Sequence, residues 1–510
     1  MATANAIIIG AGIGGLSAAL ELSRRGFAVT VLERLESVGG KASSRTWQGW
    51  RWDEGPSIVV MPWVYRELFE SSGLDPDAFL PMKRLDPAFR ILLADGRRLE
   101  LPVSIEGVRD ELARIEPADA QALGPFLAKV DAFAAKLGHA YCDRIIESWT
   151  QVLLSPLMTS ASIIPPTRGY ADEINHHFRS PLLRELFYGF PTFSGFDPRK
   201  APASLAIMPW LILREGVWYP ERGGVAAIPR ALAQACFEVG VEIRTGVEVE
   251  AIERDSRGAV TGVSTSSGTI SAPIVVSNAD YAHTCSILRS SRKDSTETRK
   301  VREGEAEPST SFLTVQIAAK RSWDLLAHHL LVMTPGAGRV YDEVYLQKQF
   351  PSDPPLYVNV TSVTDSEDAP TGGSNPFIVI NAPAIPDGMT LNLDRQNSYV
   401  DFLINRLEQA GLDGLQASIA ERRVTAPEDW RDRFRAFRGS IHGLGASHNI
   451  LGGGFRPKPF LAEAPGLYFV GGGVQPGPGM PMVAQSGKIV AARIDRDFPA
   501  KRGSASGARS

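Results

Sequence analysis

The sequence predicts an α/β fold, α+β overall, in which a parallel-sheet domain carries an inserted domain of antiparallel sheet and helices. Three observations predict it. A short β-branched run at 6–9 is followed at once by a helix-forming stretch and a second strand-like run. A strand, glycine turn and helix also close the chain at 466–493. Strand-like runs at 312–317, 356–363 and 377–383 indicate an antiparallel sheet between these two ends.

The first turn of the chain has the pattern of a dinucleotide-binding loop. Gly10, Gly12 and Gly15 follow the first strand at GxGxxG spacing. The first glycine allows a tight turn, the second lets a pyrophosphate approach the backbone, and the third lets a helix pack on the strand. The helix, expected from about Gly14 to Arg24, directs its free N–H groups and positive dipole end at the phosphates.

An acidic residue ends the second expected strand, which covers 27–32. Glu33 lies about twenty residues beyond the glycines, where a carboxylate can bind ribose hydroxyls. A carboxylate there repels an additional phosphate on the sugar, which argues against NADP. The order of these features predicts a Rossmann-type dinucleotide site: a strand, the glycines, a helix, a second strand and then the acidic residue.

The segment after Glu33 distinguishes FAD from NAD. It carries Gly39-Gly40-Lys41 and then Arg45, so two glycines permit close backbone approach and two cations face a diphosphate. This pattern resembles the extended fingerprint of FAD enzymes in the amine-oxidase-like superfamily, where the acid is followed by a GG(R/K) signature. The loop Asp53–Ser57 resembles the next flavin-touching loop of that superfamily.

The C-terminal block is expected to complete the flavin site. A buried strand at 467–470 ends in the glycines 471–473, and a rigid turn at 475–479 leads into a helix over 480–490. The start of that helix can face a carbonyl of the flavin ring. There it favours the negative charge of a reduced flavin by about 0.3–1 kcal/mol.

Both ends together resemble the bacterial-type phytoene desaturase family of carotenoid dehydrogenases. Three motifs carry this resemblance: the N-terminal fingerprint, GVWYPERGG at 216–224 and VGGGVQPGPGMPMVAQSG at 470–487. It implies removal of two hydrogens from a long acyclic polyene, with a hydride passing from an allylic carbon to FAD. The cofactor contacts that it implies fall on Gly10, Gly12, Gly14, Gly15, Glu33, Arg34, Gly39, Gly40, Lys41, Arg45, Gly55, Pro56, Ser57, Val247, Gly472, Gly473, Met482 and Val483.

Two departures from the family bear on catalysis and substrate. Gln475 stands where the family usually has His, and we take it as the one catalytic candidate, able to orient a group near the flavin ring. A catalytic base is otherwise unassigned, since His442 and His448 are expected to be structural. The run 480–483 resembles the branch that acts on hydroxylated or already desaturated carotenoids, so the identity of the polyene stays open.

The expected domains are discontinuous along the chain. The FAD-binding domain is assigned to 1–80, 216–295 and 440–500, the helical, membrane-facing cap to 81–215, and the substrate-domain sheet to 296–439. Within these, 291–308 is polar and charged and predicts a loose surface segment, and the tail 501–510 predicts disorder.

Composition excludes several classes of function. The chain has 510 residues, a net charge of −3 and a pI near 6.3, which give no reason to expect nucleic-acid binding. Its three cysteines, Cys142, Cys236 and Cys285, are widely spaced, so neither a disulfide framework nor a metal site is expected and a reducing cytoplasmic compartment fits. Because no cysteine follows Cys285, the FAD should be bound non-covalently.

A long polyene is almost insoluble in water, since each buried methylene is worth about 0.8 kcal/mol. No run of about eighteen apolar residues exists to span a bilayer. We therefore expect peripheral attachment to a membrane surface, with an apolar tunnel that opens through the cap or the dense apolar segment 205–213. Electrons would pass on to a quinone or to oxygen.

Three alternatives to desaturation stay open at this point. A protein of the same family can oxidise terminal methyl groups or isomerise double bonds, and motifs do not separate these activities. An amine or porphyrinogen oxidase shares the fold, but it would need aromatic residues that cage a polar substrate near the flavin. A binding protein resembling Rab GDP-dissociation inhibitors would not need the intact glycines and Glu33.

Overall fold

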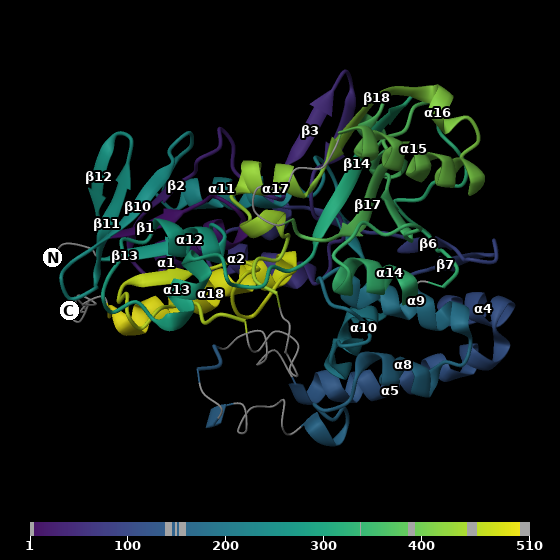
Figure 1. Cartoon of the computed structure of the whole chain (residues 1–510), viewed down its shortest axis with the longest axis horizontal. Coiled ribbons are helices and arrows are strands. Elements are labelled where there is room, and N and C mark those ends of the chain that lie inside the picture. The colour runs from purple at the N-terminus through teal and green to yellow at the C-terminus, as the bar shows by residue number, and fades with distance from the viewer. Residues whose placement is uncertain are drawn as a thin grey trace, which may run out of the picture.

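A computed structural model describes residues 5–137, 145–147, 150–151, 160–336, 338–385, 393–445 and 456–499. Figure 1 shows a parallel-sheet region that holds both visible ends of the chain, an antiparallel sheet beside it, and a group of helices below that sheet. This mixed α/β architecture confirms the predicted fold class.

The parallel sheet joins strands from distant parts of the chain. It has five strands in the order β19-β13-β1-β2-β9, and every pairing is parallel. The bounds are β1 Asn5–Ile9, β2 Ala28–Leu32, β9 Glu242–Arg244, β13 Ile274–Ser277 and β19 Leu467–Phe469. The predicted meeting of the N-terminal and C-terminal segments is therefore confirmed at β1, β13 and β19.

Two helices pack closely beside this sheet, and glycines allow it. In Figure 1 the yellow helix α18 (Met480–Asp497) lies beside α1 (Ile13–Arg24). A Cβ on Gly487 would lie 2.6 Å from a backbone nitrogen of α1. A Cβ on Gly15 would lie 2.1 Å from the Gly10 carbonyl oxygen, so the third glycine of the fingerprint has the packing role that was predicted.

The two strands within residues 242–254 belong to different sheets. β9 pairs with β2, whereas β10 (Val249–Arg254) pairs with β11 in a small antiparallel sheet. That sheet is completed by β11 Val260–Thr265 and β12 Gly268–Ser271. The turn at Gly246 therefore carries the chain from one sheet to the next rather than closing a hairpin.

The second domain is built on a seven-stranded sheet with the order β18-β14-β17-β16-β15-β6-β7. All its pairings are antiparallel except that of β15 with β6. Its strands are β6 Phe89–Leu92, β7 Arg98–Leu101, β14 Ser311–Ala319, β15 His329–Val332, β16 Leu356–Asn359, β17 Phe377–Ala382 and β18 Ile419–Thr425. β6 and β7 join this sheet although their residues fall in the segment expected to form the cap.

Helices from residues 105–214 form the layer below that sheet (Figure 1). They are α4 Ile105–Ile115, α5 Pro117–Leu137, α8 Tyr170–His177, α9 Pro181–Thr192 and α10 Ile207–Arg214. Phe126, Phe178 and Phe187 pack together at their centre, with ring centroids of the last two 4.4 Å apart. These rings belong to the same hydrophobic core that extends into the parallel-sheet domain.

The remaining elements connect these parts. The helices are α2 Pro62–Glu70, α3 Pro76–Phe79, α11 Ala227–Glu238, α12 Tyr281–Ile287, α14 Gly338–Tyr341, α15 Leu393–Gln409, α16 Leu415–Ser418 and α17 Pro427–Phe434. β3 Ser44–Trp47 and β4 Trp50–Asp53 form a hairpin. β5 Met82–Arg84 pairs antiparallel with the distant strand β8 Trp218–Pro220.

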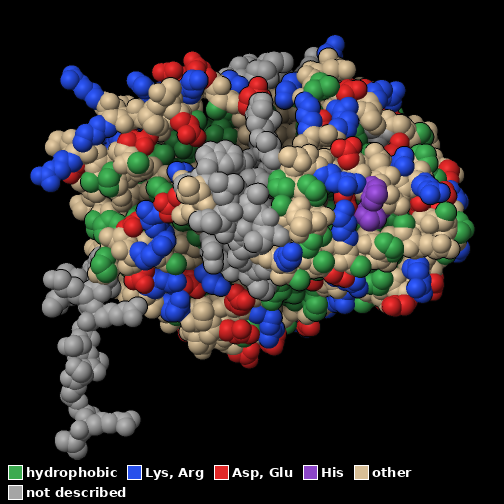
Figure 2. All heavy atoms as spheres, turned by 90° about the horizontal axis from the view of Figure 1, so that it is seen from below, with side chains coloured by type: hydrophobic (Ala, Val, Ile, Leu, Met, Phe, Trp, Pro, Cys, Tyr) green, Lys and Arg blue, Asp and Glu red, His purple; other side chains and the backbone are tan. Residues whose placement is uncertain are grey.

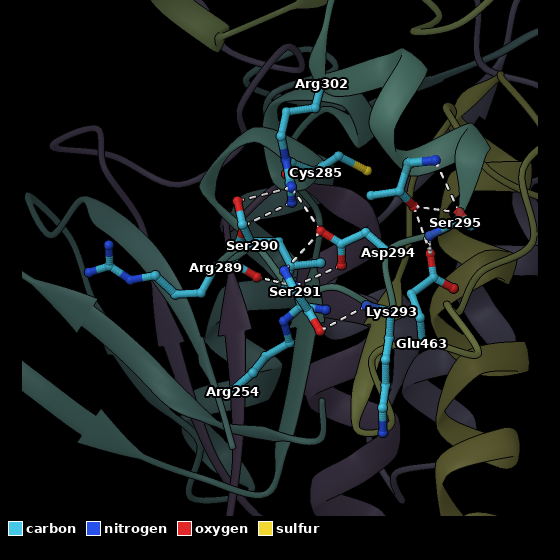
Figure 3. Close-up of polar contacts among 12 residues, drawn as sticks. Arg254, Cys285, Arg289, Ser290, Ser291, Lys293, Asp294, Ser295, Arg302 and Glu463 are labelled. Carbon is cyan, nitrogen blue, oxygen red and sulfur yellow. Dashed lines mark hydrogen bonds and ion pairs between the residues drawn. The ribbon is translucent and has the colours of Figure 1, made fainter. Parts of the chain in front are cut away.

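The segment 291–308 lies at the surface, as predicted, but it is not loose. This stretch contains the helix α13 (Thr296–Arg302) and a buried ion-pair network, drawn in Figure 3. Asp294 accepts hydrogen bonds at 2.8 Å from both Arg254 and Arg302, and it is 7% exposed. Polar composition did not reveal this order, because the pairing of Asp294 with Arg254 joins two distant parts of the chain.

The surface carries charges of both signs. On the face shown in Figure 2, Lys and Arg side chains alternate with Asp and Glu side chains, with small apolar areas between them. Among the described residues, no helix combines the length and apolar character needed to cross a bilayer. Cys142, His448 and the tail 501–510 lie outside the described residues.

Candidate active site

A cavity of about 550 Å³ lies where the parallel sheet meets the antiparallel sheet. Ile9, Leu32 and Phe469, the last residues of three parallel strands, line one end of it. Ligands of open α/β sheets bind outside the carboxyl ends of the strands. The cavity therefore lies where this type of sheet binds nucleotides.

Bare backbone forms the wall nearest to these strands. Gly10 and Gly12 line the cavity, and Gly10 has a φ of +94° that a side chain would strain. A Cβ on Gly12 would meet the Asn278 side chain and no other residue within 4 Å. Gly12 also precedes α1, whose first N–H groups receive no side-chain cap. The arrangement leaves room and hydrogen-bond donors for phosphate groups.

Gly14 and Gly15 do not line the cavity. A Cβ on Gly14 would lie 2.9 Å from the Asn278 amide nitrogen and 3.2 Å from the backbone nitrogen of Gly471. These two glycines let α1 approach the strands, so they support the cavity wall without forming it.

Glu33 is held at the rim of the cavity by backbone N–H groups. Its Oε2 accepts from Ala11 at 2.7 Å and its Oε1 accepts from Leu35 at 2.8 Å. The side chain is 6% exposed and lines the cavity. Each oxygen keeps a lone pair that a ribose hydroxyl can use.

The second glycine group lies against the first. Gly39 donates to the Ala11 carbonyl at 2.8 Å and, with Gly40, lines the cavity. Lys41 also lines it and donates to the Ile441 carbonyl at 2.8 Å. Burial lowers the pKa of Lys41 against the opposing effect of Asp280. A half-buried ammonium whose hydrogen-bond partner is a neutral carbonyl suits an anionic ligand.

Most of the other predicted contacts also lie on the cavity wall. They are Arg34, Gly55, Pro56, Ser57, Val247, Gly472, Gly473 and Val483. Met482 is not on the wall and packs against the core of the parallel domain. Arg45 is directed away from it, towards the carboxylate of Glu421 and the amide of Gln316 in the antiparallel sheet. A cofactor contact by Arg45 or Met482 is therefore not supported.

Gln475 does not have the position that a catalytic role needs. Its amide oxygen accepts from the Ile146 N–H at 2.8 Å, and its nitrogen donates to the carbonyls of Ile146 and Arg456. The residue is 5% exposed and is absent from the cavity wall. These bonds tie the turn before α18 to neighbouring backbone, which makes a structural role the better interpretation.

The opposite half of the cavity is apolar. It is lined by Phe190, Phe193, Met208, Leu211, Ile212, Leu331, Met333, Val340, Tyr341, Val344, Tyr345, Tyr357 and Val379. The dense apolar segment 205–213 supplies three of these residues from α10. This segment, through which the apolar tunnel was expected to open, thus contributes to the wall of the pocket.

Some cavity residues carried no recognised signal in the sequence. Asn278 directly follows β13, and its amide donates to the Val470 carbonyl at 3.2 Å between the two ends of the chain. Its position after a buried strand could have identified it. Tyr357 lies within a continuous apolar strand, where nothing local marks it as functional. His442 lines the cavity, and burial, with the charges of Arg456 and Lys41, lowers its pKa to about 3.

The site fits FAD on its own geometry. Glycine backbone, the uncapped start of α1, the Glu33 carboxylate and the half-buried Lys41 provide for a diphosphate and a ribose, and the glycines 472–473 before α18 continue the same wall. Residues 13–495 match the model of a family described as flavin containing amine oxidoreductase, and the chain belongs to that family. It is an FAD-dependent oxidoreductase.

Two curated relatives are similar over almost their whole length. A 4,4'-diapolycopene oxygenase from Methylomonas sp is 29% identical over 496 residues, which cover 96% of this chain and 98% of the relative. A 4,4'-diaponeurosporene oxygenase from Staphylococcus aureus (strain USA300) is 30% identical over 498 residues, with 97% and 98% covered.

Solved structures share the fold at lower identity. An oxidoreductase from Methanosarcina mazei superposes with a TM-score of 0.63 at 18% identity, covering 96% of this chain and all of that one. The cyclohexylamine oxidase from Brevibacterium oxydans IH-35A gives 0.61 at 18% identity, with 98% and 100% covered. These likenesses show the fold and carry no statement about substrate.

Proposed function

We propose that this protein oxidises an acyclic carotenoid or a related long polyene by removing two hydrogens, one of them as a hydride from an allylic carbon. The apolar half of the cavity, continuous with the cofactor half, is the observation that carries the proposal. The names of the two relatives, both of which refer to long polyenes, support the same substrate class.

The chain's own residues position the substrate and exclude water. A bound FAD supplies the two-electron acceptor. The side chains of α9 and α10 and of the sheet strands β15–β17 enclose the opposite half of the cavity, so a polyene would lie in a dry environment. A conjugated chain spreads positive charge over many carbons, and a strong protein nucleophile is not required.

A second candidate is oxidation of a terminal carbon with gain of oxygen. The printed names of both relatives are those of oxygenases, which favours this alternative. The two reactions differ in their products, because desaturation removes hydrogens and adds no oxygen, whereas the second candidate adds oxygen at a chain end.

Pigment analysis tests both candidates in one experiment. The protein is expressed in a host that makes acyclic carotenoids or squalene-derived polyenes. The extracted pigments are separated, and their molecular masses are measured by mass spectrometry. Desaturation gives products that have lost pairs of hydrogens, with absorption at longer wavelength. Gain of oxygen at a chain end supports the second candidate, and unchanged pigment in the presence of flavin-loaded protein contradicts both.

The matched control is a variant that cannot hold the cofactor. Gly12→Val places a branched side chain at a position where even a Cβ alone would lie 2.6 Å from the Asn278 oxygen. It should give a colourless protein and unchanged pigment. If it turned over pigment as fast as the wild-type protein, the assignment of this wall to the cofactor would be wrong.

We also propose non-covalent FAD and peripheral attachment to membranes, with a quinone or oxygen as the final acceptor. The insolubility of long polyenes supports attachment. Sedimentation with carotenoid-loaded liposomes measures it, and full recovery in the supernatant contradicts it. Acid precipitation should leave the yellow chromophore in solution, whereas a yellow pellet would show a covalent link.

A further inference from the structure

Three buried polar side chains form a chain that starts at the cavity wall. Ser57 Oγ lies 2.7 Å from the Tyr357 hydroxyl, which lies 2.8 Å from Nδ1 of His329. Ser57 and Tyr357 line the cavity, and His329 lies behind them on β15 with no exposed surface. Buried polar groups cost free energy unless they are hydrogen-bonded, so their presence in an apolar sheet calls for an explanation.

The surroundings of His329 assign the direction of these hydrogen bonds. The Asn359 amide nitrogen donates to the His328 carbonyl at 3.0 Å and lies 3.5 Å from His329 Nδ1, so Nδ1 faces a donor and accepts. Burial lowers the pKa of His329 to about 3, so the ring is neutral. A proton on Nδ1 would face the Asn359 N–H group, so we place the proton on Nε2, which has no hydrogen-bond partner among the described residues. Tyr357 therefore donates to His329, and Ser57 donates to Tyr357.

We propose that Ser57 and Tyr357, oriented by His329, turn only oxygen lone pairs towards the cavity and so stabilise positive charge on the bound ligand. This inference rests on the proposed function. A bound FAD would take up the electron pair of a broken allylic C–H bond as hydride, and the polyene would be left with positive charge. The proton that the neighbouring carbon then loses, as the new double bond forms, would end in the bulk water outside the cavity.

Preoriented dipoles aimed at developing charge stabilise a transition state because they need no rearrangement when the charge appears. His329 acts through Tyr357 and is a positioning residue. The hydroxyls of Ser57 and Tyr357 would otherwise be free to rotate and to point a hydrogen at the ligand. The same wall should disfavour a carboxylate, because lone pairs repel negative charge.

Two single-chain probes of equal length and opposite charge, dodecyldimethylammonium and dodecanoate, test this polarity. Their binding to the flavin-loaded protein is followed by the change in flavin fluorescence, which requires no turnover. The wild-type protein should bind the ammonium probe more tightly. Tyr357→Phe and His329→Leu should each weaken ammonium binding about tenfold, as expected for loss of one hydrogen bond to a charged group.

Two further variants separate positioning from structure. His329→Asn retains an acceptor near the position of Nδ1 and should restore ammonium binding to within about threefold of the wild-type value, a smaller loss than that of one hydrogen bond. Tyr170→Phe removes another buried tyrosine hydrogen bond, 2.7 Å to the Phe187 carbonyl and away from the cavity wall, and should leave probe binding unchanged.

Turnover provides a second readout. In Tyr357→Phe, kcat should fall while KM for the polyene stays the same, because the lost interaction exists only in the transition state. Tighter binding of dodecanoate than of the ammonium probe, or unchanged ammonium binding in both Tyr357→Phe and His329→Leu, would overturn the proposal. If His329→Leu does not fold, Tyr357→Phe decides alone. Pigment analysis tests the proposed function separately.

Discussion

Gly12→Ala and Asn278→Ala together can separate packing from cofactor binding. A Cβ on Gly12 would lie 2.6 Å from the Asn278 oxygen, well inside contact distance, and would meet no other residue. Overpacking of this kind costs about 1–3 kcal/mol of unfolding free energy. Asn278→Ala removes the obstructing amide but also its hydrogen bond to the Val470 carbonyl, worth about 0.5–1.5 kcal/mol.

We expect the two changes to be strongly non-additive in the apoprotein. Gly12→Ala alone should lower the unfolding free energy, and the double variant should be no less stable than Asn278→Ala, because the clash is then gone. FAD affinity should behave differently. The methyl group still occupies the space that a pyrophosphate needs, so both variants should bind FAD at least about tenfold more weakly.

Urea unfolding of the apoprotein and fluorescence titration with FAD measure these two quantities on the same samples. Asn278→Ala alone serves as the control for loss of the amide. The reasoning would be refuted if the double variant bound FAD as tightly as Asn278→Ala, because the Gly12 backbone would then not face the cofactor.

Three further predictions concern stability and substrate binding. Burial opposes ionisation of Glu173, but hydrogen bonds from His177 and Lys129 and the charges of Lys129 and Arg168 lower its pKa to about 2. The ionised Glu173 should therefore stabilise the folded state above pH 4.5, and this contribution should disappear as the pH falls towards 2. Glu173→Gln should remove that part of the acid transition in melts recorded against pH. Burial lowers the pKa of His329 to about 3. Between pH 6.5 and 3 the His329 ring therefore binds a proton only in the unfolded chain, and the unfolding free energy should fall on acidification by about 1.4 kcal/mol per pH unit. His329→Leu should flatten this slope, and an unchanged slope would contradict neutral burial. Leu211→Arg, which places a charge on the apolar wall, should abolish polyene turnover and leave the flavin spectrum intact; full turnover would refute the placement of the substrate.

Local patterns explain why the nucleotide half of the site could be predicted. The turn between β1 and β2 is encoded within one continuous stretch, in which the order of strand, glycines, helix and Glu33 determines the geometry. The C-terminal glycines were equally visible because they end a strand and begin a helix. In both cases the chemistry depends on backbone, which sequence spacing specifies well.

The substrate half depends on contacts between distant elements, and the sequence was less informative there. Tyr357 meets Ser57 across 300 positions of the chain, and no periodicity reveals such a pair. Arg45 was expected at the diphosphate because of its spacing, but Glu421 on β18 offers it a carboxylate. The charges of 291–308 indicated exposure, although Asp294 pairs with two arginines in the interior.

The order of strands in the parallel sheet has a consequence for synthesis on the ribosome. β1 emerges from the ribosome before its neighbour β13, which follows some 265 positions later, and β19 follows later still. The nascent chain must therefore keep an unpaired strand edge through most of elongation, when such edges are prone to wrong association. Because the glycines 472–473 that follow β19 line the cavity, the complete FAD site can form only after β19 has joined β13.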